Sequence, residues 1–290
     1  MLVLEGTSNT GIGGSIAKAL GAELSVATEK IFPDGESEIQ ISARPKGQDV
    51  IIVQTTYPFQ DKRLLQLFLM TNQMRKAGAK SITAVVPYLA YAREDRSYEG
   101  KNNVVSISAV LELLGREGAG RLVTVAPHKK ESLSGFTGKS IAIDPIAVLS
   151  GSIKGELRSP FVLAPDRGAL HLAEEAAGVL GCGYAHIDKQ RDRNTGETSI
   201  IGTPKDDIKG RDVVIIDDII STGGTAAQAA EFAVKHGARS VSAAAVHLVM
   251  AGGAHERLKA AGVSEVYGTN TISYDKAKLV DISELIARSI

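Results

Sequence analysis

Short runs of β-branched residues alternate along this chain with stretches whose apolar residues recur at helical spacing. In residues 104–114, for example, Val104, Ile107 and Leu111 fall on one face of a helix. Strands separated by helices of this length form βαβ units, so the pattern predicts a mostly parallel sheet with helices packed against it. The predicted strands are 50–53, 81–86, 122–125, 162–164, 213–216 and 240–246, and the predicted helices are 64–77, 104–114, 168–180 and 225–236.

Part of this pattern occurs twice. Residues 76–84 (Lys-Ala-Gly-Ala-Lys-Ser-Ile-Thr-Ala) resemble residues 235–243 (Lys-His-Gly-Ala-Arg-Ser-Val-Ser-Ala), and the strand before each helix starts with an aspartate, Asp49 or Asp212. Two interpretations are open. Helices of any α/β protein can end in Gly-Ala because glycine caps them, or the chain holds two related domains in tandem. Either way, Asp144-Pro145 is a plausible domain boundary.

The composition excludes several classes of protein. The 33 basic and 33 acidic residues give a net charge of zero, so no basic excess is available for a nucleic-acid partner. No apolar run approaches the roughly 18 residues that span a bilayer, and no secretory signal is visible, so we expect no membrane partner and a cytoplasmic location. The single cysteine, Cys182, rules out an intrachain disulfide and a cysteine-based zinc site.

Residues 213–225 carry the clearest chemical signal. Four apolar strand residues precede two carboxylates, a loop of hydroxyls and glycines follows, and then a helix begins. In an open α/β sheet, ligands bind at the carboxyl ends of strands, and the N–H groups of a helix start favour an anion. Carboxylates can accept hydrogen bonds from sugar hydroxyls or face a hydrated Mg²⁺, so the segment predicts a sugar-phosphate site. Its residues are Asp217, Asp218, Ser221, Thr222, Gly223, Gly224 and Thr225.

A second glycine-rich segment, residues 6–14, follows a short strand and precedes a helix. It lacks the Gly-x-Gly-x-x-Gly spacing of a dinucleotide loop. We therefore predict a tight turn between a strand and a helix of the first domain.

The 213–225 segment resembles the phosphoribosyl-pyrophosphate loop shared by type I phosphoribosyltransferases and ribose-phosphate pyrophosphokinases. Five more segments, in the same order along the chain, resemble those of the pyrophosphokinases. They are Phe32-Pro-Asp-Gly-Glu36, Pro87-Tyr-Leu-Ala-Tyr-Ala-Arg-Glu-Asp-Arg96, Ala126-Pro-His128, Ala164-Pro-Asp-Arg-Gly-Ala169 and Asp188-Lys-Gln-Arg-Asp-Arg-Asn194. The resemblance to this family implies an α/β fold of two tandem phosphoribosyltransferase-like domains, 1–144 and 145–290, each with a mostly parallel sheet flanked by helices.

The resemblance also implies that the first domain binds ATP. In the family, the loop matching residues 32–36 reaches the ATP of a neighbouring subunit, and the arginine matching Arg93 sits on the ATP phosphates. Glu94 stands where the family usually has glutamine. From the residues alone, a surface turn is the favoured interpretation of 32–36, and a solvated charge run is the alternative for the segment after Pro87. The implied ATP-binding residues are Phe32, Asp34, Gly35, Glu36, Arg93, Glu94, Arg96 and His128.

Metal and catalytic roles follow from the same resemblance. His128 matches a histidine that binds the Mg²⁺ of Mg-ATP, although the adjacent Lys129 and Lys130 differ from better-known members and receive no role. Asp166 matches a second metal-associated residue, and it is equally well read as a helix cap. Lys189 and Arg191 match the catalytic loop, and Arg191 is also assigned to ribose 5-phosphate. A solvated hairpin tip is the plainer alternative for that loop.

The implied reaction is the Mg²⁺-dependent transfer of a diphosphoryl group from ATP to the C1 hydroxyl of ribose 5-phosphate, for nucleotide biosynthesis. An ATP site shared between subunits implies self-association. Two alternatives stay open. A type I phosphoribosyltransferase would share the 213–225 loop but has no reason for the segments around Phe32 and Arg93. A non-catalytic regulatory homologue would carry lesions in the catalytic loop, whereas Lys189 and Arg191 are intact.

Overall fold

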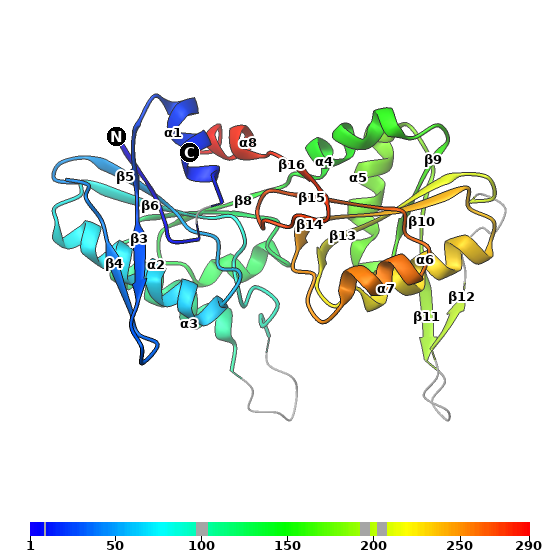
Figure 1. Cartoon of the computed structure of the whole chain (residues 1–290), viewed down its shortest axis with the longest axis horizontal. Coiled ribbons are helices and arrows are strands. Elements are labelled where there is room, and N and C mark those ends of the chain that lie inside the picture. The colour runs from blue at the N-terminus through cyan, green and yellow to red at the C-terminus, as the bar shows by residue number, and fades with distance from the viewer. Residues whose placement is uncertain (9, 97–103, 192–197, 202–207) are drawn as a thin grey trace. The chain divides into compact units, whose positions relative to one another are not determined.

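The structure is a computed structural model that describes residues 1–290 except Asn9, 97–103, 192–197 and 202–207; of 188–191 and 198–201 it describes only the backbone. The chain divides into two compact units (Figure 1). One contains Met1–Asp144 and Asp281–Ile290, and the other contains Pro145–Val280. The predicted boundary at Asp144–Pro145 falls at this division, but the last ten residues lie in the first unit and not in the second.

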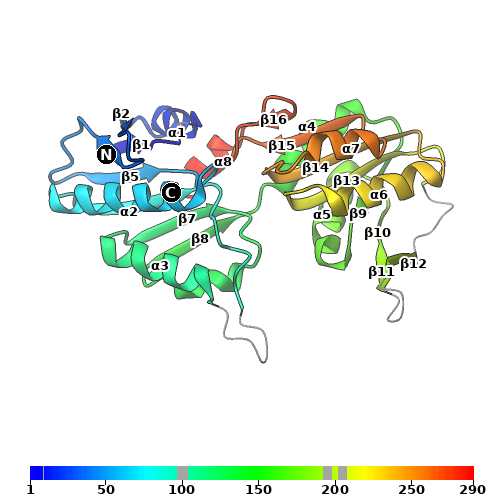
Figure 2. The same cartoon turned by 60° about the horizontal axis from the view of Figure 1, so that its bottom comes forward.

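The first unit is built on a six-stranded parallel sheet in the order β2-β1-β5-β6-β7-β8. Helices α1 and α8 cover one face, and α2 and α3 cover the other (Figure 2). The chain proceeds from β1 toward one edge and from β5 toward the other, and right-handed crossovers in opposite directions place helices on opposite faces. The elements are β1 (Leu2–Glu5), α1 (Ile12–Leu20), β2 (Glu23–Val26), the hairpin β3 (Thr28–Ile31) and β4 (Ser37–Gln40), β5 (Asp49–Val53), α2 (Gln60–Lys76), β6 (Ser81–Val86), α3 (Ser106–Glu117), β7 (Arg121–Val125), the 3₁₀ turn η1 (Lys130–Gly135), β8 (Lys139–Ile143) and α8 (Ser283–Ala287).

The C-terminal segment belongs to the first unit because its apolar face is buried there. Ile282 and Ile286 are fully buried, and α8 packs against α1. The Arg121 guanidinium, at the start of β7, donates a hydrogen bond to the carbonyl of Ile290. Assigning residues 281–290 to the second domain was therefore wrong.

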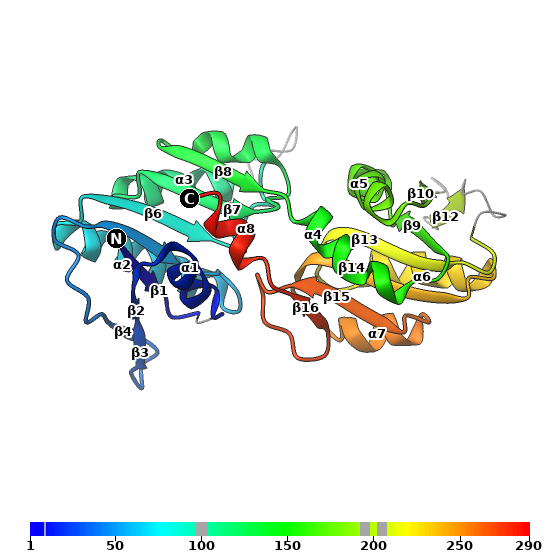
Figure 3. The same ribbon diagram turned by 90° about the horizontal axis from the view of Figure 1, so that it is seen from above.

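The second unit repeats the same topology. Its six parallel strands have the order β10-β9-β13-β14-β15-β16, and a hairpin again follows the edge strand. Helix α5 lies on one face, with α6 and α7 on the other (Figure 3). The elements are α4 (Ile146–Ile153), the 3₁₀ turns η2 (Lys154–Glu156) and η3 (Arg167–Ala169), β9 (Pro160–Ala164), α5 (Leu170–Leu180), β10 (Tyr184–His186), β11 (Asp188–Arg191), β12 (Thr198–Ile201), β13 (Asp212–Ile220), α6 (Gly224–Lys235), β14 (Ser240–Leu248), α7 (Ala254–Ala260), β15 (Glu265–Thr269) and β16 (Lys278–Val280).

The matching strand orders favour the tandem interpretation of the sequence repeat, and the predicted fold class is confirmed. All the predicted helices and strands are present, with ends that differ by a few residues. The difference that bears on the predicted site is β13, predicted over 213–216 but observed to Ile220. It is longer because it pairs with β14 from Asp212↔Ser240 to Ile220↔Leu248, so Asp217 and Asp218 belong to the strand.

The repeated segment also has a physical role in both units. In the second, the buried Asp212 carboxylate opens β13 and accepts hydrogen bonds from Arg239 Nε (2.8 Å), Ser240 Oγ (2.7 Å) and the Arg158 N–H (2.7 Å). These bonds tie the starts of neighbouring strands together. The first unit has the same bonding pattern at a more exposed position, from Lys80 Nζ (3.3 Å) and Ser81 Oγ (2.6 Å) to Asp49.

We predict that Asp212→Asn lowers the stability of the second unit by about 2–3 kcal/mol, because a buried cluster of charge-assisted hydrogen bonds is lost. Burial alone would raise the pKa of Asp212, but bonds from Arg239, Ser240 and two backbone N–H groups outweigh it and hold that pKa well below its ordinary value. The carboxylate therefore contributes fully above roughly pH 5, and its contribution is lost as the pH falls through and below the unfolded value of about 3.9.

Thermal unfolding followed by circular dichroism between pH 3 and pH 7 measures this effect. The matched control is Asp49→Asn, which should shift the midpoint much less because its carboxylate remains half exposed. Equal shifts for the two variants would contradict the prediction.

Candidate functional site

The predicted sugar-phosphate residues lie at the carboxyl end of β13 and the start of α6. Gly223 adopts a left-handed conformation (φ 74°) as the residue before the helix, and a Cβ there would lie 3.3 Å from Ala254. A Cβ on Gly224 would meet nothing within 4 Å. The first N–H groups of a helix have no partner within the helix, so they are available to an anion that approaches this open backbone.

The loop after β13 is held by hydrogen bonds from residues 250–257, which the sequence analysis did not identify. The N–H groups of Met250 and Ala251 donate to the carbonyls of Ile220 (3.0 Å) and Ser221 (2.9 Å), and the Arg257 guanidinium donates to the carbonyl of Thr222. The residues that follow β14 thus fix the loop by binding the carbonyl oxygens of residues 220–222. An arginine in the short helix α7 gave no signal in the sequence, because its partners are backbone atoms distant along the chain.

Three carboxylates influence one another at this edge of the second sheet. Burial is the main cause that raises the pKa of Asp217, to about 8, and the charges of Asp218 and Asp166 add to it. Asp217 accepts the N–H of Asp218 (2.9 Å), and Asp166 accepts the N–H of Gly168 (2.8 Å) as the cap of η3. Asp166 therefore acts as a helix cap, which was the alternative interpretation of its sequence, and it uses its Oδ1 atom to do so.

Lys189 and Arg191 lie on β11, which pairs with β12 in an antiparallel hairpin; Lys189 is opposite Ile200 and Arg191 is opposite Thr198. Their side chains lie outside the described part of the chain, as do residues 192–194 of the same predicted segment.

In the first unit, the segments around Arg93 and His128 follow the neighbouring strands β6 and β7. Arg93, Glu94, Arg96 and His128 are all exposed. The Lys129 ammonium forms an ion pair with Asp95 (2.8 Å), whose side chain is only 8% exposed. This bond from Lys129, and secondarily its charge, lower the pKa of Asp95 and keep it ionised. Lys129, which received no role from the sequence, thus joins the two predicted ATP-binding segments.

Both segments include a residue with a left-handed backbone that is not glycine: Tyr91 (φ 66°) and Ala126 (φ 37°). Such residues cost on the order of 1–3 kcal/mol each and persist only where the surroundings hold them. For the first segment those surroundings are the buried hydroxyls of Thr55 and Thr56. Thr56 donates to the carbonyl of Tyr88 (2.6 Å), and Thr55 accepts the N–H of the same residue (3.2 Å).

Residues 32–36 form the exposed turn between β3 and β4. The N–H of Phe32 donates to Glu36 O (2.8 Å), the N–H of Gly35 donates to Phe32 O (2.9 Å), and Asp34 accepts the N–H of Glu36 (3.1 Å). Gly35 has a positive φ of 94° that the turn requires. The predicted turn is present, and its two carboxylates and aromatic ring stand at the tip of a hairpin.

The glycine-rich segment after β1 leads through a turn into α1, as predicted, and the side chain of Glu5, the last residue of β1, fills this turn. The buried Glu5 carboxylate accepts the N–H groups of Gly11 (2.7 Å) and Gly14 (3.0 Å) at the start of α1. A Cβ on Gly13 would lie 2.8 Å from Glu5, so glycine is needed for this close approach. Glu5 therefore takes the anion position of this helix.

Among the described residues, no group of three or more His, Cys, Asp or Glu side chains is arranged to hold a metal ion. Within the same part of the chain, no helix combines the length and apolar character needed to cross a membrane.

Comparison with known proteins gives consistent results. Two family models match: the N-terminal domain of ribose phosphate pyrophosphokinase over residues 1–118, and the phosphoribosyl transferase domain over residues 141–275. The ribose-phosphate pyrophosphokinase of Saccharolobus solfataricus is 46% identical over 293 residues, covering 100% of both chains. That of Pyrococcus furiosus is 39% identical over 89% of this chain and 90% of its own. A solved structure, the phosphoribosylpyrophosphate synthetase from Mycobacterium smegmatis, aligns with a TM-score of 0.87 at 28% identity, over 99% of this chain and 97% of that one.

We predict that Lys129→Met loosens the Arg93 segment, because the ion pair to Asp95 is lost. Hydrogen exchange of the Glu94 N–H, which donates to Tyr91 O (2.9 Å), should become faster. Lys130→Met is the matched control, since Lys130 is the adjacent lysine and is also exposed. Unchanged exchange in Lys129→Met, or equal acceleration in both variants, would count against the role given to Lys129.

Proposed function

This chain belongs to the ribose-phosphate pyrophosphokinase family and is an enzyme of that type, and we propose that it transfers the β,γ-diphosphoryl group of ATP to the C1 hydroxyl of D-ribose 5-phosphate. The products are 5-phospho-α-D-ribose 1-diphosphate and AMP, and the product serves nucleotide biosynthesis in the cytoplasm. The observation that carries the proposal is the second unit's edge, where Asp217 and Asp218, near the end of β13, are followed by a short loop and an open, glycine-containing helix start.

Ribose 5-phosphate has two chemically different ends, and this edge offers partners for both. The 5-phosphate is bound by the hydroxyls of Ser221, Thr222 and Thr225 and by the N–H groups that begin at Gly224. The ribose hydroxyls donate to Asp217 and Asp218. Because the loop's carbonyls are engaged by residues 250–257, the loop keeps its shape before the substrate arrives, and little ordering entropy is lost on binding.

ATP is bound by the first unit. Arg93 and Arg96 form charge-assisted hydrogen bonds to the triphosphate, and Glu94 and His128 complete that surface. Phe32 stacks on the adenine, and Asp34 and Glu36 accept from its exocyclic amine, with Gly35 shaping the turn. The Lys129–Asp95 ion pair fixes the Arg93 and His128 segments to each other, so that the phosphate contacts act together.

Mg²⁺ fits the carboxylates of the second unit. Asp166 offers a hard oxygen ligand of the kind that Mg²⁺ prefers, and such a site usually has one or two carboxylates, with water and substrate phosphates as the other ligands. Burial together with the neighbouring negative charges raises the pKa of Asp217 to about 8, which is the electrostatic situation that a divalent cation relieves. Asp166 would hold the ion there, and His128 would do so beside ATP. Bound Mg²⁺ supplies neutralisation of phosphoryl oxygen charge.

The transfer itself needs positioning and charge neutralisation more than covalent chemistry. Attack by the C1 oxygen at the β-phosphorus moves negative charge onto the bridging oxygen of the departing AMP. Lys189 and Arg191 neutralise this charge, and Arg191 also contacts ribose 5-phosphate.

Lys189→Ala is expected to lower kcat by roughly 10²–10³ while changing KM much less, because the lost contact forms mainly in the transition state. Steady-state kinetics with ATP and ribose 5-phosphate test this. Lys235→Ala, an exposed lysine in the last turn of α6, is the matched control and should behave as wild type. A near wild-type kcat for Lys189→Ala would remove Lys189 from the mechanism.

The reaction as a whole is tested by AMP formation from ATP and Mg²⁺, with and without ribose 5-phosphate. AMP that appears only with the sugar phosphate, in step with phosphoribosyl pyrophosphate, is the expected result. ATP binding without turnover would indicate a regulatory homologue. Consumption of phosphoribosyl pyrophosphate with a nucleobase, and no ATP binding, would indicate a phosphoribosyltransferase.

If residues 32–36 contact the ATP of a neighbouring subunit, the active enzyme is at least a dimer. Sedimentation velocity at assay concentrations should therefore show no active monomer. Phe32→Ala subunits mixed with Arg93→Ala subunits should recover activity, because a mixed pair would contain one intact shared site. A fully active, monodisperse monomer would contradict this prediction.

A further inference from the structure

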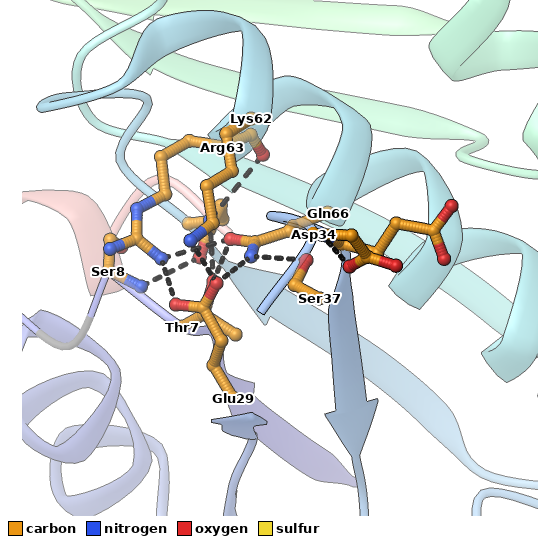
Figure 4. Close-up of polar contacts among 10 residues, drawn as sticks. Thr7, Ser8, Glu29, Asp34, Ser37, Lys62, Arg63 and Gln66 are labelled. Carbon is orange, nitrogen blue, oxygen red and sulfur yellow. Dashed lines mark hydrogen bonds and ion pairs between the residues drawn. The ribbon is translucent and has the colours of Figure 1, made fainter. Parts of the chain in front are cut away.

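The buried side chain of Gln66, on α2, joins several elements of the first unit (Figure 4). Its Oε1 accepts hydrogen bonds from Thr7 Oγ1 (2.5 Å) and Arg63 Nη1 (2.9 Å), and its Nε2 donates to Glu29 Oε1 (2.6 Å) and Ser37 Oγ (3.2 Å). Gln66 is only 1% exposed. The amide thus uses both acceptor positions and both donors, which fixes its orientation.

Glu29, on β3, is the second centre of this network. Its carboxylate pairs with the Lys62 ammonium and with Arg63 Nη1 (3.3 Å), both on the first turns of α2. Burial raises the pKa of Glu29, but hydrogen bonds from Lys62 and Gln66 and the charge of Arg63 outweigh it, and the net shift is downward. Glu29 is therefore ionised at neutral pH, and its side chain is 15% exposed.

These contacts bear on the hairpin that carries residues 32–36. The hairpin is a two-stranded sheet of its own, separate from the six-stranded sheet. An isolated two-stranded hairpin is marginally stable in water, so its direction depends on contacts with the rest of the unit. Ile39 packs against the core near the hairpin's base. Glu29 on one strand and Ser37 on the other both bond to Gln66, so a single side chain holds both strands to α2.

The two related units differ at this place. Counted back from the matching helix ends, Lys76 and Lys235, Gln66 corresponds to Thr225 of the second unit. Helix α2 has 17 residues and α6 has 12, so the first unit has additional helix where the second has its glycine-rich loop. The additional turns carry Lys62 and Arg63. At this position the first unit holds a hairpin, whereas the second unit has an open loop that an anion can approach.

We propose that Gln66 and Glu29 are positioning residues that fix the direction of the β3–β4 hairpin and thereby place Phe32, Asp34 and Glu36 against ATP. This inference rests on the proposed function, because it gives the hairpin tip a role in ATP binding. Neither residue touches the substrate.

Gln66→Met tests the proposal, because it keeps the side-chain volume and removes all four hydrogen bonds. We expect the KM for ATP to rise roughly 10- to 100-fold, as for a displaced binding group, with the KM for ribose 5-phosphate unchanged and kcat at saturating ATP within about twofold. Hydrogen exchange of the Phe32 and Gly35 N–H groups, both bonded within the turn, should become faster, whereas a merely structural defect would raise exchange across the whole unit.

Asn72→Leu is the matched control. Asn72 lies on the same helix, and its amide bonds to Glu117, away from the hairpin. This variant should leave the KM for ATP and the exchange of the turn unchanged. If Gln66→Met does not fold, Ser37→Ala removes one of the same bonds at the hairpin itself and should produce a smaller change in the same direction.

Phe32→Ala distinguishes the positioning role of Gln66 from the proposed role of the hairpin tip in ATP binding. If it raises the KM for ATP while folded Gln66→Met does not, the positioning role is overturned and the proposed function stands. If neither variant changes the KM for ATP, the hairpin has no part in ATP binding, and both the ATP role of the tip and the positioning role fail.

Discussion

Every strand of the two large sheets is parallel to its neighbours, and the placement of the functional segments depends on this constraint. Parallel strands end at one edge, so the segments that follow neighbouring strands meet there although they are distant in sequence. In the first unit the edge gathers the segments after β5, β6 and β7, which include Thr55, Arg93 and His128. In the second it gathers the segments after β9, β13 and β14.

The two units show how one topology accommodates two different arrangements where a strand leads into a helix. In the second unit, β13 continues through Asp217 and Asp218, and a short loop opens onto a helix start. In the first, the strand ends earlier, the helix begins earlier, and the polar groups of Gln54, Thr55 and Gln66 bond within the protein. The start of α1 is also filled, by Glu5. The corresponding polar positions of the first copy are thus occupied by internal hydrogen bonds, and Arg93 and Arg96 are exposed in the segment that follows β6.

Ion pairs at buried carboxylates connect the local structure to these segments. Asp212 ties the start of β13 to that of β14, Asp95 ties the Arg93 segment to Lys129, and Glu29 ties the hairpin to α2. All three carboxylates have little exposure. Arg239 and Lys129 reach water, which satisfies the first two buried charges at limited desolvation cost, whereas Arg63 beside Glu29 is itself largely buried. Each pair joins segments that the parallel sheet has already brought near, so the pairs refine an arrangement that the sheet creates.

The sequence alone determined the α/β class and the alternation of strands and helices, because these depend on hydrophobic period and on residues adjacent in the chain, and for the same reason it predicted 213–225 as a sugar-phosphate segment. It also contained the repeat whose aspartates, Asp49 and Asp212, proved to bond the matching Lys80 and Arg239. The tertiary structure alone decided that residues 281–290 join the first unit, that Lys129 pairs with Asp95, that Arg257 bonds to the loop after β13, and that Gln66 joins both strands of the hairpin. Each of these is a contact between residues far apart in sequence, and its formation depends on which strands become neighbours, which no local pattern of residues specifies.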